Sequence, residues 1–128
     1  MNQLPEDSAK QVDITKIIKG RMKTGRDKYG HGLKSEMDTR QWGTLNNSWL
    51  EMAEEEHLDA IVYVLADYVK CKKISRGACS DDNDCILALV KCPNKIESDY
   101  HKETVLNLLQ LIMTGRTKYH QYQFAGQY

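Results

Sequence analysis

Apolar residues recur at helical spacing in four segments of the chain. In the first of these, Ile14, Ile17, Ile18 and Met22 mark one side of a helix. The predicted helices run from about Asp13 to Tyr29, from Trp49 to about Lys73, from Cys85 to Cys92, and from near Asp99 onward. The hydrophobic pattern therefore predicts an all-α fold with a core of four helices.

Residues that cap or break helices mark the predicted boundaries. Ser48 stands where the second helix needs an N-cap, and Pro93 ends the third helix. Residues 30–47 form a polar stretch between the first two helices, and a loop of this length in a compact domain is usually functional. We expect residues 1–128 to form a single domain, with residues 1–12 and 121–128 as loose tails.

The composition narrows the classes of partner. The chain has 128 residues, which is the length of one domain, and its 18 basic and 18 acidic side chains balance. Balanced charge gives no reason to expect a nucleic-acid polymer or an anionic membrane as a partner. The N-terminus is polar, and no apolar run approaches the roughly 18 residues of a membrane span. We therefore expect a cytoplasmic protein that does not enter a membrane.

Four cysteines, Cys71, Cys79, Cys85 and Cys92, lie within one stretch of the chain. Their spacing lacks the C-x-x-C pairs of most structural zinc sites. The pattern favours reduced thiols in a cytosolic protein, some of them buried as small apolar groups. A zinc site and a disulfide stay open as alternatives.

A basic and aromatic element occurs twice. Residues 24–29 read TGRDKY and residues 114–119 read TGRTKY, each near the predicted C-terminal end of a helix. Cations at that end of a helix complement its dipole, which is one explanation of both copies. The alternative is that the first copy helps to hold a phosphate group and a base.

The second helix carries a cluster of carboxylates. On a wheel of about 100° per residue, Glu51 shares the predicted core-facing direction, and Glu54 and Glu55 lie within about 60° of it. Asp59 lies on the flank of this stripe, and Glu56 points away from it. The apolar residues predicted to face the core in the same direction are Leu58, Val62, Leu65 and Val69.

Several like charges on an inward face need compensation, and bound Mg²⁺ or Mn²⁺ supplies it because hard cations take oxygen ligands. Glu51, Glu54, Glu55 and Asp59 are therefore the candidate metal ligands, with Glu54 and Glu55 as candidate catalytic groups. Three simpler explanations remain. Ser48 and Glu51 match a capping box, and the helix dipole favours acidic side chains in a first turn. The cluster could also form salt bridges with Lys and Arg of the first helix.

Cations and rings nearby complete a candidate phosphate and base site. Arg21, Lys28 and Tyr29 share the apolar side of the first helix with its isoleucines. Arginine and lysine pair with phosphate, and an aromatic face stacks on a base. The candidate substrate-binding residues are Arg21, Lys28, Tyr29, His31, Arg40 and Trp42.

These residues resemble a known family. Residues 54–64, EEEHLDAIVYV, are similar to the E-E-x-x-D helix of the MazG-like all-α nucleoside triphosphate pyrophosphohydrolases. Residues 28–33, KYGHGL, and residues 38–43, DTRQWG, resemble short elements of phage-encoded members. The resemblance covers roughly residues 14–73.

The resemblance implies a four-helix core assembled as a dimer or tetramer, and a cytoplasmic location in the host if the chain is phage-encoded. It also implies hydrolysis of nucleoside triphosphates between the α and β phosphates with Mg²⁺ or Mn²⁺. The family takes its ligands from an E-x-x-E pair and an E-x-x-D pair on two neighbouring helices. Glu51 and Glu54 match the first pair, and Glu56 and Asp59 match the second on the same helix.

The second acidic helix of the family is missing here, which leaves three readings open. A compact site on one helix, or one completed by a partner subunit, would hydrolyse nucleotides. The same fold would otherwise bind and sequester a nucleotide or a nucleotide-derived signal without hydrolysis. A helical interaction protein without ligand chemistry would use the acids only as cap and salt-bridge residues.

Overall fold

The computed structural model describes the backbone of residues 13–127 and the side-chain surroundings of residues 13–115. Within this range the fold is all-helical, as predicted, with four α-helices, two short 3₁₀ helices and no strand. The elements are α2 (Ile14–Tyr29), η1 (Thr39–Trp42), α3 (Trp49–Lys72), α4 (Asn83–Lys91), η2 (Pro93–Lys95) and α5 (Asp99–Gln127). The predicted tail at residues 1–12 lies outside the described residues.

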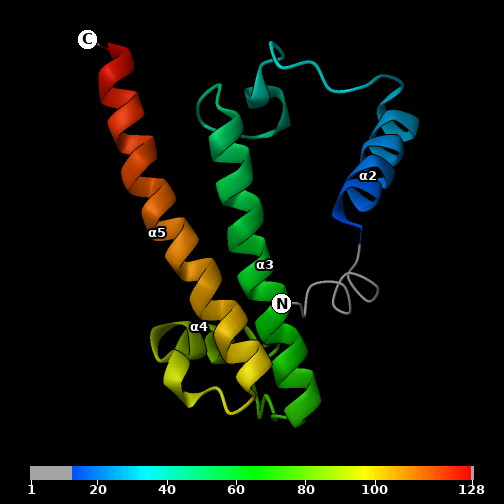
Figure 1. Cartoon of the computed structure of the whole chain (residues 1–128). Helices are drawn as coiled ribbons and strands as arrows, with labels where there is room; N and C mark the ends of the chain where they lie inside the picture. Colours follow the sequence, from blue (N-terminus) through cyan, green and yellow to red (C-terminus); the bar gives the residue numbers. More distant parts are fainter. Residues whose placement is uncertain (1–12, 128) are drawn as a thin grey trace, which may run out of the picture. The chain divides into compact units, whose positions relative to one another are not determined.

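The chain divides into two compact units, residues 1–37 and 38–128. The described part of the first unit is α2 and the segment after it (Figure 1). Asp13 caps α2 by accepting a 3.1 Å hydrogen bond from the amide of Lys16. Gly30 ends it in the left-handed region, with φ of 83°, and Arg26 and Lys28 complement the dipole of the last turn. None of the side chains of α2 is buried.

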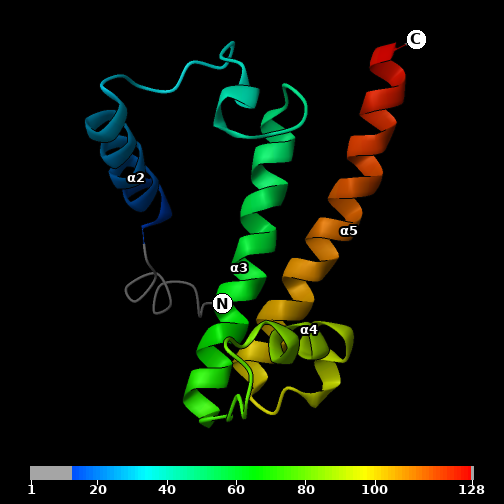
Figure 2. The same ribbon diagram turned by 180° about the vertical axis from the view of Figure 1, so that it is seen from behind.

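The second unit is built on α3 and α5, which run antiparallel (Figure 1). Their contact buries Ile61, Leu65 and Tyr68 of α3 against Val105 and Ile112 of α5. The two views agree that α4 packs where α3 ends and α5 begins (Figures 1 and 2), and it adds Ile86 and Leu89 to this core. Full burial of a side chain such as Leu65 stabilises the fold by about 1.5–3 kcal/mol.

The segment before α3, residues 38–48, is a compact loop held together by hydrogen bonds of Thr39. The side chain of Thr39 is fully buried. Its hydroxyl accepts a 2.8 Å hydrogen bond from the amide of Ser48 and lies 2.8 Å from the hydroxyl of Thr44. The amide of Thr39 donates to the side chain of Asn47 at 3.1 Å. Because these bonds join the two ends of the loop, they fix the point at which α3 begins.

The start of α3 matches the prediction, whereas α5 is longer than expected. Ser48 is the N-cap of α3 and accepts a 3.1 Å hydrogen bond from the amide of Glu51. The backbone of α5 continues through Gln127, so residues 121–127 are helical. The prediction that residues 114–119 lie near a helix C-terminal end is therefore wrong for this second copy, while the first copy does end α2.

Candidate functional site

The buried face of α3 is rotated from the face that the helical wheel predicted. Leu65 and Val69 are buried as expected, but Leu58 is 38% and Val62 44% exposed. The centre of the buried stripe instead passes through Ile61, because α5 packs on that side of α3. Two apolar lines run along this helix, and the sequence does not tell which one α5 covers.

This rotation divides the four predicted metal ligands. Glu54 lies on the buried side with Ile61, and its Oε2 is shielded from solvent. Glu51 is partly buried, whereas Glu55 and Asp59 are exposed. Glu56, which the wheel turned outward, is exposed as well. Glu54 is therefore the acid that continues the core-facing line of α3 toward its N-terminus.

The carboxylate of Glu51 is held by the loop before α3. Its Oε2 accepts the amide of Leu45 at 2.5 Å, and its Oε1 accepts the amide of Asn46 at 3.1 Å and the side-chain nitrogen of Asn46 at 3.2 Å. Together with the bond from its own amide to Ser48, this contact secures the first turn of α3. Glu51 thus has a structural role that the capping explanation anticipated in part.

The four acids do not gather into a preformed ligand group within residues 13–115. Among these residues, three potential ligands converge at another place, where Asp67, Cys71 and His101 bring one donor atom each within 4.8 Å of one another. This group was not predicted from the sequence. Asp67 and Cys71 lie one helical turn apart on α3, and this spacing could have indicated a pair of ligands. His101 is far away along the chain, so its place beside them could not be predicted from spacing.

Arg40 and Trp42 both lie in the loop before α3, and each is engaged there. The guanidinium of Arg40 donates from Nε and Nη2 to the carboxylate of Asp38, at 2.9 and 2.6 Å. These hydrogen bonds lower the pKa of Asp38 from 3.8 to about 2. The ring of Trp42 packs at 5.8 Å and 36° against that of Trp49 and keeps a partly exposed edge. Arg40 must exchange its partner to bind a phosphate.

The remaining predicted substrate residues belong to the first unit, and all four are exposed. Lys28 places its ammonium 5.3 Å from the ring centroid of Tyr29 in a cation–π contact. The Nδ1 atom of His31 lies 2.8 Å from the carbonyl oxygen of Gly32. Arg21 stands on α2. Their exposure leaves these side chains accessible to a ligand.

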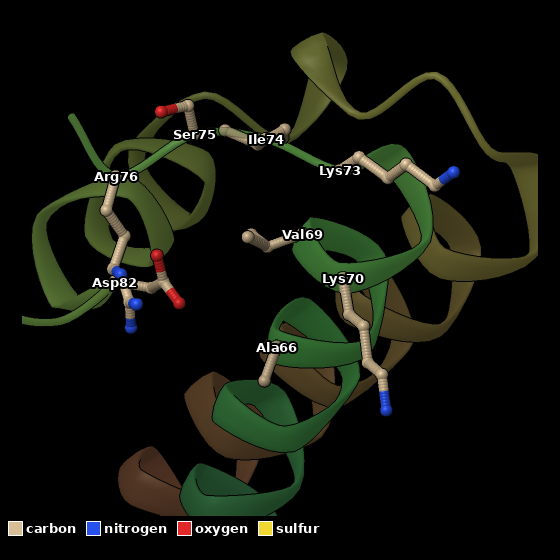
Figure 3. A pocket seen from close by; sticks show the side chains of 8 residues that line it. All are labelled: Ala66, Val69, Lys70, Lys73, Ile74, Ser75, Arg76 and Asp82. Carbon is tan, nitrogen blue, oxygen red and sulfur yellow. The ribbon is translucent and has the colours of Figure 1, made fainter.

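A cavity of about 550 Å³ opens at the C-terminal end of α3, and Figure 3 shows its lining. Three of the residues are basic, Lys70, Lys73 and Arg76. The ammonium groups of Lys70 and Lys73 point away from the hollow, while the side chain of Arg76 lies beside Asp82 (Figure 3). Since the cations do not converge, this cavity is not arranged as a phosphate site.

Comparisons of the chain with models of protein families, with curated proteins and with solved structures find no match. Among the described residues, no helix has the length and the apolar character needed to cross a membrane.

Proposed function

We propose that this protein hydrolyses nucleoside triphosphates to monophosphate and pyrophosphate with Mg²⁺ or Mn²⁺. The observation that supports the proposal most directly is the position of Glu54. The carboxylate oxygen Oε2 of Glu54 is shielded from solvent. Glu54 lies on the same side of α3 as the buried Ile61, at the boundary between the apolar residues of that side and the acidic first turns of the helix. A carboxylate held at such a boundary has little freedom, which suits a group that positions a water molecule or a cation.

The donors on α3 fit a hard cation in kind, because Mg²⁺ and Mn²⁺ take carboxylate oxygens and keep several waters. Glu55 and Asp59 lie one turn apart and exposed, so they would hold the ion together with Glu54. When bound, the cation neutralises phosphate charge and polarises phosphorus. Further ligands would come from a second copy of the chain, since the described acids do not converge by themselves.

The chain's own residues do the remaining work. Glu54 or Glu55 orients the attacking water or accepts its proton. Arg40, released from Asp38, neutralises charge on the leaving pyrophosphate. The exposed part of the Trp42 side chain would contact the base. The parts assigned to Arg21, Lys28, Tyr29 and His31 in substrate binding stay predictions from the sequence.

A nucleotide panel with product analysis tests this proposal. The purified protein is incubated with each ribo- and deoxynucleoside triphosphate and Mg²⁺ or Mn²⁺, and monophosphate and pyrophosphate are quantified. We expect Glu54→Gln to lower the rate by about 10²–10⁴-fold, as for loss of a general base. Glu103→Gln, at an exposed position of α5, is the control and keeps the rate. Absence of pyrophosphate with every nucleotide excludes the enzyme.

One observation favours a second function, the binding of a nucleotide or nucleotide-derived signal without hydrolysis. Among the described residues, the predicted ligands on α3 do not gather into a metal-ligand group of three. Calorimetry with the same nucleotide panel separates the outcomes. Stoichiometric binding without product identifies a sequestering protein, and neither binding nor product identifies a helical interaction protein. A rise in melting temperature with Mn²⁺ that Glu55→Ala removes would argue against the latter.

A further inference from the structure

A mixed group of donors lies where α5 starts beside the C-terminal half of α3. His101 Nε2 is 2.8 Å from Oδ2 of Asp67, and Sγ of Cys71 is 3.6 Å from the same oxygen. All three donor atoms lie within 4.8 Å of one another. Asp67 and Cys71 come from one face of α3 and His101 from the first turns of α5, so the group joins the two long helices.

The backbone around His101 is fixed by several contacts. The hydroxyl of Tyr68, a buried residue of α3, accepts the amide of Glu97 at 3.0 Å. Lys72 and Glu97 form an ion pair at 2.9 Å. Ser98 caps α5, because its Oγ accepts the amide of His101 at 3.3 Å. The segment entering α5 is thereby held against α3, and the imidazole has a defined position.

The second ring nitrogen of His101 is also fixed. Nδ1 lies 2.6 Å from Oγ of Ser98, and the side chain is only 12% exposed. Histidines that bind metals usually hold their other nitrogen in such a hydrogen bond, which sets the ring orientation and directs the free lone pair. With Nδ1 hydrogen-bonded to Ser98, Nε2 faces the Asp67 carboxylate, and either the proton of Nε2 or a metal ion can lie between the two atoms.

We propose that Asp67, Cys71 and His101 form a site for a zinc-class transition metal that staples α3 to α5. Thiolate, imidazole and carboxylate together prefer Zn²⁺ to Mg²⁺ or Mn²⁺, so this site differs in chemistry from the acids of the proposed hydrolytic function and does not depend on it. On binding, the Cys71 thiol loses its proton to solvent, and so does the imidazole where it is protonated. Two anionic ligands then balance the divalent charge.

The observed distances require only a small adjustment. Zinc bonds of about 2.0 Å to nitrogen and oxygen and about 2.3 Å to sulfur place tetrahedral ligands roughly 3–4 Å apart. The separation of Sγ from Oδ2 already lies in that range, while Nε2 and Oδ2 must part slightly from 2.8 Å. Asp67 is 62% exposed and Cys71 is exposed, so both ligands are free to move by this amount and a water has access to the fourth position.

Without metal, His101 Nε2 and Cys71 Sγ are hydrogen-bonded to Oδ2 of Asp67, and the pKa of Asp67 is lowered chiefly by its hydrogen bond to His101. The titratable and charged groups that face this carboxylate are His101, Cys71 and Lys70. Hydrogen bonds to Asp67 account for the contacts of both His101 and Cys71 without metal, whereas a metal ion would bond to the sulfur as a thiolate. The experiment must therefore report on sulfur.

Cobalt substitution reports on sulfur directly. Chelator-treated protein is titrated with Co²⁺, and a sulfur-to-cobalt charge-transfer band with tetrahedral visible bands is expected at one equivalent. Cys71→Ser should abolish the charge-transfer band, whereas Cys79→Ser, an exposed thiol on the connector, should keep it. His101→Ala should weaken zinc affinity by at least about tenfold in a chelator competition. Removing a residue that only hydrogen-bonds to a metal ligand already costs about this much, so loss of the ligand itself should cost no less.

Melting temperatures give a second measure of zinc binding at Cys71. Zinc should raise the melting temperature of the wild-type chain and of Cys79→Ser but not of Cys71→Ser. Equal circular dichroism of the two variants in chelator verifies that Cys71→Ser folds, which its exposed position favours. The absence of a charge-transfer band in the wild type, or its persistence in Cys71→Ser, overturns the site. Neither result bears on nucleotide hydrolysis, which the product analysis tests separately.

Discussion

At the scale of single residues, Arg40 in the loop before α3 has a partner that was not predicted from the sequence. Arg40 was predicted to bind phosphate, and in the structure it clasps the carboxylate of Asp38. Both groups are largely exposed, so water screens the pair and its contribution to stability is small. The pair orients the guanidinium of Arg40 but binds it weakly. A phosphate group, which carries more negative charge than the Asp38 carboxylate, would therefore compete for the guanidinium.

Replacing Arg40 by alanine should return the pKa of Asp38 from about 2 toward its ordinary 3.8. The carboxylate then loses the guanidinium hydrogen bonds and keeps only the backbone bond from residue 40. A pH titration of the Asp38 carboxyl carbon by NMR measures this change. A pKa that stays near 2 in Arg40→Ala contradicts the assignment.

The same pair gives the sign of a pH effect on folding. Because the folded-state pKa of Asp38 is depressed, its stabilising contribution is present above the unfolded value and is lost as pH falls from about 4 to about 2. In Arg40→Ala this acid-side loss should shrink. Lys23→Ala, which removes the partner of Asp27 on α2, should leave the Asp38 titration unchanged.

At the scale of elements, the ends of α3 were predictable because they follow local chemistry. Ser48 caps the start as its residue type indicated, and Lys73 ends the helix in the left-handed region with φ of 56°. The amide of Lys73 donates to Lys70 and that of Ile74 to Val69, which is the pattern of a Schellman motif. A lysine stands here where glycine is usual.

Lys73→Gly should therefore stabilise the protein by about 1 kcal/mol, since glycine adopts the left-handed region without the Cβ clash. Lys70→Gly, three residues earlier within the helix, should destabilise it by about the same amount. Chemical denaturation of the two variants measures both changes. A loss of stability in Lys73→Gly would show that its side chain contributes more than its backbone conformation costs.

The faces of these helices were harder to predict than their ends. The wheel placed Leu58 and Val62 in the core, but α5 packs against Ile61, Leu65 and Tyr68 instead. Both lines on α3 are apolar, and only the tertiary partner decides between them. For the same reason the group of Asp67, Cys71 and His101 was not predicted. Contacts between segments that are distant along the chain produce no periodic pattern in the sequence. The residue at the N-cap position therefore predicted the start of α3, whereas spacing along one helix did not predict which of its faces the other helices cover.

At the scale of the whole molecule, much apolar surface is left exposed on the described helices. On α3, Leu58 and Val62 lie one turn apart on the same exposed line. On α2, all the isoleucines are exposed. Surfaces of this kind commonly form interfaces. Assembly as a dimer or tetramer stays a prediction from the sequence, and the exposed line on α3 is a surface on which it can be tested.

Sedimentation velocity tests this expectation. We predict that the wild-type chain sediments as a dimer or tetramer, and that Val62→Glu lowers its mass by half or more because a buried charge disrupts the interface. Tyr63→Glu changes the neighbouring residue, which is exposed on a different face, and should keep the assembly. A wild-type monomer at tens of micromolar would contradict the prediction.

The loop stapled by Thr39 has a practical consequence for work on this protein. Its hydrogen bonds described above join residues between 38 and 51, from Thr39 and Ser48 to Glu51. A shortened chain that begins at Asp38 would retain every one of them, together with α3, α4 and α5. That chain is the natural sample for isotope labelling, in which the amides of Thr39 and Ser48 would report on whether α3 keeps its starting point.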